Sequence, residues 1–239
     1  MVRRMIRTLL IFLGLAALAA PAAAADRRYS VTDFDRVVVE GPYIVRLTTG
    51  RPSSAVASGP QAGIDRILID VSGTTLRVRR NRNAWGASQS GQPGVVEITL
   101  ATRNLRSARV IGPGRLEIDG AEGMRVDLTL EGSGEIRAAN IAADNLSLGL
   151  LGSGRIEVAG RARNLRGDFQ GTGNIDASAL AAEDAIVSST SVGPVILAAA
   201  RTARVTNNGL GDVTVLGRAA CTITGPGAAQ VRCGETSGR

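Results

Sequence analysis

Apolar and polar positions along the C-terminal part of the chain follow a pattern that recurs about every 20 residues, a period typical of solenoids. Glycine-rich turns mark the repeat, and apolar residues alternate with polar ones after each turn. The turns are Gly112-Pro113-Gly114, Gly132-Ser133-Gly134, Gly152-Ser153-Gly154, Gly171-Thr172-Gly173, Ser191-Val192-Gly193, Gly209-Leu210-Gly211 and Gly225-Pro226-Gly227. Because alternation of this kind places one side of a strand inward, each repeat is predicted to contain β-strands.

Equivalent positions of successive repeats carry similar residues. Two residues after each turn stand Leu116, Ile136, Ile156, Ile175, Val195 and Val213. Two residues before the next turn stand Leu130, Leu150, Phe169, Ser189, Asn207 and Ile223. We therefore expect each repeat to run turn, strand, corner, strand, and to stack on the next in a parallel β-solenoid, or β-helix. Antiparallel hairpins are the alternative, but like residues recur after one full repeat rather than mirrored about a turn.

Charged residues beside the turns alternate in sign between repeats. The first position after the turn reads Arg115, Glu135, Arg155 and Asn174, and the position two residues later reads Glu117, Arg137, Glu157 and Asp176. Stacked in parallel, these side chains would form a checkerboard of opposite charges. Its main effect would be to fix the register, since a slip by one residue would turn the charges inward.

The N-terminal third has β character but lacks the repeat. We expect one domain over residues 26–239, in which residues 26–94 form a β-meander cap and residues 95–239 form the repeats. Strands are predicted over 37–39, 43–47, 64–71 and 75–79. Residues 81–94 are rich in Gly, Ser and Asn and predict a mobile loop.

Residues 1–25 read as a signal peptide. Arg3, Arg4 and Arg7 precede a short apolar run over 9–20, and Ala23 and Ala25 suit a cleavage site. An N-terminal anchor helix is the alternative. We expect export to the periplasm, the cell surface or the medium, and no membrane span in the mature chain, because no later segment approaches about 18 consecutive apolar residues.

Cys221 and Cys233 are the cysteines of the chain. In an oxidising compartment such a pair favours a disulfide, with two free thiols as the alternative. Here a disulfide would pin the last, irregular repeat.

Several segments together resemble one known family. They are Asp33-Phe34-Asp35-Arg36-Val37-Val38-Val39-Glu40-Gly41, then Tyr43-Ile44-Val45-Arg46-Leu47, Leu76-Arg77-Val78 and the serial Gly-Ser-Gly turns. This combination resembles the exported bacterial "putative auto-transporter adhesin, head GIN domain" family over about residues 30–233. The resemblance implies a β-solenoid and a location in the envelope or outside the cell, and it brings no catalytic residues.

Residue types restrict the possible chemistry. The chain has no His, which excludes His-dependent triads, and no set of ligands predicts a metal or other cofactor. The Gly-Ser-Gly turns precede strands rather than helices, so they do not predict phosphate sites. A β-helix polysaccharide lyase or hydrolase is the alternative function. Its candidate acids are Asp168, Asp176, Glu183 and Asp184.

Basic residues point to binding rather than catalysis. The densest group is Arg77, Arg79, Arg80 and Arg82 with Trp85, and the alternative is an exposed strand end and loop. Arginine forks suit phosphate or carboxylate groups, and an indole stacks on sugars. The net charge of +7 falls to about +4 when three signal-peptide arginines are removed, which does not require nucleic acid. We therefore predict a non-catalytic, adhesin-like scaffold of the envelope, whose partner is an anionic glycan or another envelope protein.

Overall fold

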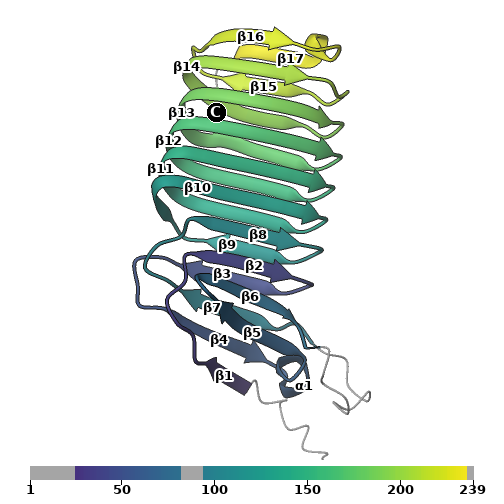
Figure 1. Ribbon diagram of the computed structural model, residues 1–239. Coiled ribbons are helices and arrows are strands. Elements are labelled where there is room, and N and C mark those ends of the chain that lie inside the picture. Colours follow the sequence, from purple (N-terminus) through teal and green to yellow (C-terminus); the bar gives the residue numbers. More distant parts are fainter. Residues whose placement is uncertain (1–24, 82–93, 236–239) are drawn as a thin grey trace, which may run out of the picture.

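The chain forms a stack of parallel coils, and the inward-facing residues of the coils are mainly apolar and buried (Figure 1). The structure is a computed structural model and describes residues 25–81 and 94–235. The repeats begin with β8 Ser107–Ile111, β9 Arg115–Ile118, β10 Ala121–Gly132, β11 Glu135–Gly152, β12 Arg155–Gly171 and β13 Asn174–Ser191. They end with β14 Val195–Asn207, β15 Val213–Leu216, β16 Ala220–Thr224, the short 3-10 helix η1 Ala228–Gln230 and β17 Val231–Glu235. The predicted parallel solenoid is confirmed.

One long strand makes almost a whole coil, as β11 illustrates. Its inward residues are Ile136 and Ala138, then Ile141 and Ala143, then Leu146, Leu148 and Leu150. Exposed residues interrupt this series near Asn140 and Asn145, where the strand bends. The coil thus has two bends between turns rather than the single predicted corner. Alanine fills much of the short middle run, and two inward residues are too few to show as a periodic pattern.

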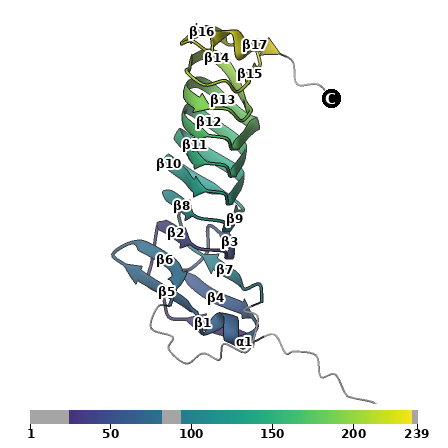
Figure 2. The same ribbon diagram turned by 90° about the vertical axis from the view of Figure 1, so that its right-hand side faces the viewer.

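Corresponding residues of successive coils pair in parallel, as the columns predict. Ile136 lies between Leu116 and Ile156, and Leu148 pairs with Leu128. The runs before the turns form one face, which is turned to the viewer in Figure 1 and is called the front face below. The runs after the turns form the back face. Figure 2 shows the two faces side by side along the axis, with the turns toward the viewer.

The solenoid has an earlier coil that the sequence pattern did not reveal. It consists of β2 Arg36–Glu40 and β3 Ile44–Thr48, joined through Gly41-Pro42. β2 pairs in parallel with β8, and β3 pairs in parallel with β9. The sequence pattern predicts a cap over residues 26–94, which includes this coil. Its residues escaped the repeat because their partners on the next coil are distant in sequence: Arg46 and Glu117, in hydrogen-bond contact, are 71 residues apart.

The rest of the N-terminal third closes the lower end. It comprises β1 Ala25–Tyr29, β4 Ser54–Gly59, the helix α1 Gln61–Ile64, β5 Ile67–Ser72, β6 Thr75–Arg80 and β7 Glu97–Ala101. The hairpin of β5 and β6 is antiparallel, as predicted, but its first strand begins at Ile67 because Ile64 belongs to α1. β4 pairs antiparallel with both β1 and β7. Strand direction therefore changes only in this cap.

Polar groups enter the core near the C-terminal end. Ser189, Ser191 and Asn207 are almost completely buried. The Ser191 hydroxyl donates to the Gly171 carbonyl at 3.2 Å and accepts from the Gly193 amide at 3.0 Å. These bonds hold a turn in which Ser191 stands where earlier turns have glycine. Side-chain hydrogen bonds thus preserve the turn after the glycine pattern weakens.

No helix among residues 25–81 and 94–235 is long and apolar enough to cross a membrane. The predicted signal peptide lies outside the described residues, apart from Ala25 in β1, and stays a prediction.

Candidate binding faces

The predicted arginine cluster is divided by the geometry of β6. Arg77 and Arg79 are exposed and project from the same side of the strand, since they are two residues apart. Asp70 of β5 neutralises Arg79 at 3.3 Å. Arg80 lies on the opposite side, and Arg82 and Trp85 lie outside the described residues. Within the described part of the group, Arg77 forms no ion pair and lies on the front face between Val38 of β2 and Asp70 of β5.

Arg80 lies near Tyr43, the residue before β3. Burial raises the pKa of the Tyr43 hydroxyl, and the positive charge of Arg80 opposes that rise. Tyr43 is only 9% exposed and packs in the core beside the Gly41 turn. Arg80 therefore lies on the Tyr43 side of β6, away from the surface that carries Arg77.

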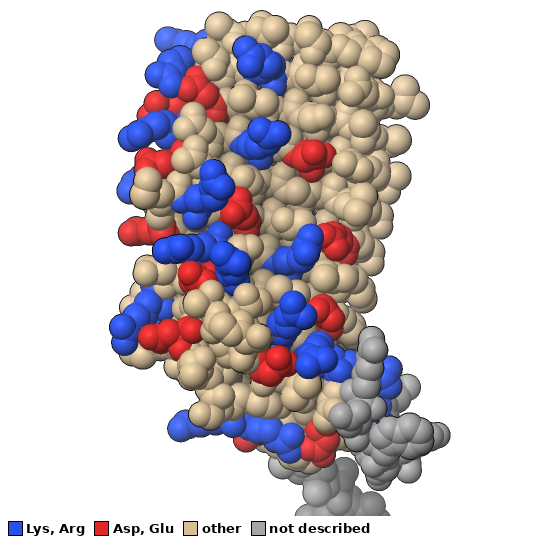
Figure 3. Space-filling view, in the orientation of Figure 1, with Lys and Arg blue, Asp and Glu red and all other residues tan. Residues whose placement is uncertain are grey.

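Further along the front face, Arg166 and Arg204 are exposed and frame Ile186, which stacks between them and is 49% exposed. Among the described residues, no carboxylate lies within ion-pair distance of Arg77, Arg166 or Arg204. Figure 3 shows this face, on which basic and acidic side chains interleave while the edge formed by the turns is largely uncharged. In the described part of the chain, Arg77, Arg166 and Arg204 are thus the positive charges of this face without an ion pair, and the carboxylates Asp127 and Asp168 on the same face also form no ion pair.

The back face carries the predicted checkerboard. Glu135 contacts Arg115 at 2.8 Å and Arg137 at 2.7 Å, and Arg137 also reaches Glu157 at 3.5 Å. Arg46 of the earlier coil extends the ladder by pairing with Glu117 at 3.2 Å and with Glu97. The ladder borders a shallow depression of about 390 Å³. These charges are largely satisfied within the protein.

The stacking of Glu157 on Asp176, which interrupts the alternation, has a local explanation. The Asp176 carboxylate accepts hydrogen bonds from the Ser178 amide at 3.0 Å and the Ser178 hydroxyl at 2.6 Å. Asp176 is therefore held on its own strand. Glu157 contacts Arg137 on the preceding coil instead.

A second ladder lies at the bend that precedes the front face. Arg163 pairs with Asp144 at 3.5 Å, and Arg201 pairs with Glu183 at 3.9 Å and with Asp184. Sequence reasoning missed it, because the register shifts at the bends blur the repeat here. The arginines 161, 163 and 166, close in sequence, diverge around this bend.

Asp184 makes this bend sensitive to acid. Hydrogen bonds from Arg201, and then from Thr202, lower the pKa of the Asp184 carboxyl from 3.8 to about 2. The ionised form of Asp184 is thus favoured by folding, so its stabilising effect is present above pH 3.8 and lost as the pH falls toward 2.

We expect the melting temperature of Asp184→Asn to fall less than that of the wild type between pH 3.8 and 2. Asp168→Asn, which also removes one charge, is the control; equal pH profiles for wild type and Asp184→Asn would contradict the prediction.

Of the four acids considered for glycoside chemistry, Glu183 and Asp184 lie together, and both contact Arg201, whereas Asp168 and Asp176 lie apart from them. Asp168 lies on the front face beside Gln170, Asp176 lies on the back face, and Glu183 and Asp184 pair with Arg201 at the bend. Paired carboxylates must lie within about 10 Å across a substrate site. No group of three or more possible metal-binding side chains occurs within residues 25–81 and 94–235.

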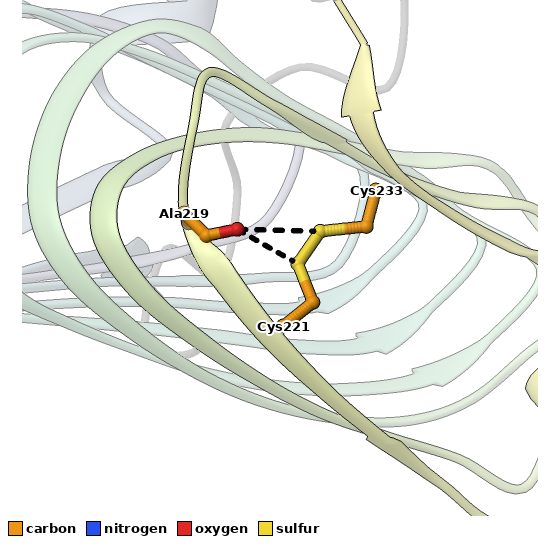
Figure 4. The surroundings of a disulfide bond; sticks show 3 residues. All are labelled: Ala219, Cys221 and Cys233. Atoms are coloured by element: carbon orange, nitrogen blue, oxygen red, sulfur yellow. Dashed lines mark hydrogen bonds between the residues drawn. A yellow bond between two sulfur atoms is a disulfide. The ribbon is translucent and has the colours of Figure 1, made fainter.

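The two cysteines are joined by a disulfide with Cα atoms 6.6 Å apart (Figure 4). It links β16 to β17 across the end of the core. The Sγ atoms of both cysteines lie near the carbonyl oxygen of Ala219.

Removing the disulfide with Cys221→Ser/Cys233→Ser is expected to cost about 2–3 kcal/mol of unfolding free energy, because the closed loop is short. Denaturant titrations with and without a reductant check this. The reductant should destabilise the wild type to the level of the double variant and leave that variant unchanged. A reductant-insensitive wild type would contradict it.

The parallel stacked coils with two flat faces define a β-solenoid protein. The chain belongs to the "putative auto-transporter adhesin, head GIN domain" family, whose model matches residues 33–219. The resemblance noted in the sequence is thereby confirmed. No curated protein matches the chain.

Solved structures share the fold. A putative adhesin from Bacteroides fragilis NCTC 9343 is 20% identical with a TM-score of 0.77, and the match covers 86% of this chain and 95% of that one. A putative lipid binding protein from Parabacteroides distasonis ATCC 8503 is 20% identical with a TM-score of 0.68, covering 89% and 97%. A putative adhesin from the same strain is 18% identical with a TM-score of 0.65, covering 86% and 95%. At these identities the likeness shows the fold alone.

Proposed function

We propose that this protein is exported and acts without catalysis, as an adhesin-like scaffold whose front face binds an anionic glycan of the cell envelope. The observation that supports the proposal is the set of exposed front-face arginines without an acidic partner, Arg77, Arg166 and Arg204. Elsewhere, on the back face and at the bend, most charges are paired. Arg155 on the back face and Arg161 at the bend also lack an ion pair among the described residues, but Arg166 and Arg204 stand in one column of the front face and share that face with Arg77.

The spacing suits an extended ligand. Arg166 and Arg204 stand two coils apart in one column, which corresponds to about 10 Å. Arg77 lies several coils away toward the cap. A polymer with regularly spaced carboxylates or sulfates could contact all three when aligned with the solenoid axis, whereas a small anion would reach one. Exposed Ile186 between the upper arginines offers an apolar contact to sugar rings.

Family membership and fold agree with this proposal. Members carry the adhesin description, and the predicted signal peptide suits an exported location. Among the acids of the alternative lyase or hydrolase, Asp168 and Asp176 lie on opposite faces, and Glu183 and Asp184 lie together but both contact Arg201. The hydrogen bond from Arg201 lowers the pKa of Asp184, the opposite of what a general acid needs, so the geometry favours binding over hydrolysis.

The test measures binding of the purified mature chain to immobilised dextran sulfate and polygalacturonate, with uncharged dextran as the blank. We expect salt-sensitive binding to at least one polyanion, lost in Arg77→Ser/Arg166→Ser/Arg204→Ser. The matched control is Arg115→Ser/Arg137→Ser/Arg155→Ser, which removes the same charge from the back face. If both variants lost binding equally, net charge would explain the binding, and a site on the front face would be contradicted. Depolymerisation of polygalacturonate would instead support the enzyme alternative.

A further inference from the structure

The N-terminal end of the solenoid is protected against pairing with another sheet. β1 is an edge strand, and its inward side carries Arg27, which pairs with Asp65 after α1 at 2.5 Å. Inward-pointing charge on an edge strand opposes edge-to-edge association, because a docking strand would bury it. Ile64 and Ile67, at the end of α1 and the start of β5, are almost completely buried. This end is therefore closed.

The C-terminal end has no such protection among the described residues. β16 pairs with β14, and β17 pairs with β15, each along one edge. The inward positions of these strands are all apolar: Cys221, Ile223, Val231 and Cys233. β16 contains neither charge nor proline, which commonly protect an edge strand, whereas β17 carries Arg232 and a bulge at Gly234, so β16 is the less protected of the two edges.

The apolar residues of the last coil are more exposed than their partners on the preceding coil. Ala203 and Val205 are 1% and 0% exposed, whereas Cys221 and Ile223, their partners on the last coil, are only half-buried. The described residues thus leave an apolar layer and two strand edges open together. The disulfide joins these two edge strands and holds them in one geometry (Figure 4).

We propose that this end docks against the same end of a second copy of the chain. A two-fold axis perpendicular to the solenoid would bring identical edges together with antiparallel strands, an arrangement that sheets accept. The neutral β16 edge meets no like charge in such a pairing. Docking onto the N-terminal end of another copy would instead bring the apolar end against the edge strand that carries the Arg27–Asp65 pair. The end-to-end dimer would thus present two sets of front faces.

The experiment follows the mass of the mature, oxidised protein by light scattering and its maximum dimension by X-ray scattering. The edge strands are short, so concentrations from roughly 1 µM to 1 mM are needed. We expect the mass to double and the maximum dimension nearly to double. Ile223→Arg, which places a charge inside the open end, should remain monomeric. Thr224→Arg, its neighbour on the outward side of β16, should still dimerise.

Three results would overturn the proposal: a wild-type monomer at every concentration, a dimer no longer than the monomer, or a folded Ile223→Arg protein that dimerises normally. Hydrogen exchange of the wild type provides a test that needs no variant. The backbone amides of β16 and β17 should become more protected as concentration rises, while those of β1 and β5 should not. Concentration-independent exchange at β16 and β17 would equally overturn it.

Discussion

Gly152→Ala is expected to destabilise the protein by about 4 kcal/mol, although it adds a single methyl group. Gly152 has φ of +130°, a region that residues with a side chain rarely adopt, and a Cβ there would lie 2.4 Å from the carbonyl oxygen of Gly132. That oxygen accepts hydrogen bonds from the amides of Ser153 and Gly154 at 2.9 and 3.0 Å. Moving it away would therefore break the bonds that join the two coils.

Denaturant unfolding of the mature protein measures this effect, and the same strand offers a matched control. At Gly149 a Cβ would meet only the Thr129 side chain at 3.5 Å, and no positive φ is involved. Gly149→Ala should change the unfolding free energy by no more than about 0.5 kcal/mol. If both variants unfolded alike, close stacking of the turns would not be what requires glycine at position 152.

The repeats were predictable because each coil presents the same few residues in one order. Turn glycines, inward columns and the Arg137 ladder all followed from parallel stacking. The coil of β2 and β3 was not predictable in this way, since residues 49–106 separate it from its neighbour and Tyr43 stands where later turns have glycine. The four-residue helix α1 is too short to leave a helical period.

The candidate site was less predictable than the fold. Arg77, Arg79 and Arg80 are close in sequence, but a strand sends neighbouring side chains to opposite sides, and Asp70 neutralises one of them. Arg166 and Arg204 are far apart in sequence and come into one column only when the coils stack. A run of like charges on one strand therefore suggests a larger surface patch than the strand forms. Charges that are separated by whole repeats form a patch that is easily missed in the sequence.

For Asn207→Leu, the apolar pattern and the structure lead to opposite expectations for stability. Leucine occupies the equivalent position in earlier coils, at Leu130 and Leu150, so the pattern alone suggests that this change would improve the core. In the structure Asn207 is completely buried and fully engaged. Its side-chain amide donates to the carbonyls of Gly211 at 3.2 Å and Gly227 at 2.9 Å, and its oxygen accepts from the Gly209 amide at 3.2 Å.

We therefore expect Asn207→Leu to cost about 3–5 kcal/mol, because it takes the side-chain partner from the buried Gly211 carbonyl and Gly209 amide and leaves the Gly227 carbonyl with the Gln230 amide alone. Equilibrium unfolding checks the value, with Asn208→Leu at the exposed neighbouring position as the control, expected within about 0.5 kcal/mol of the wild type. Loss of hydrogen-exchange protection at Gly209 in Asn207→Leu would locate the damage in the turn. A neutral or stabilising result would mean that leucine packing outweighs these bonds, and that the apolar columns alone determine the last coils.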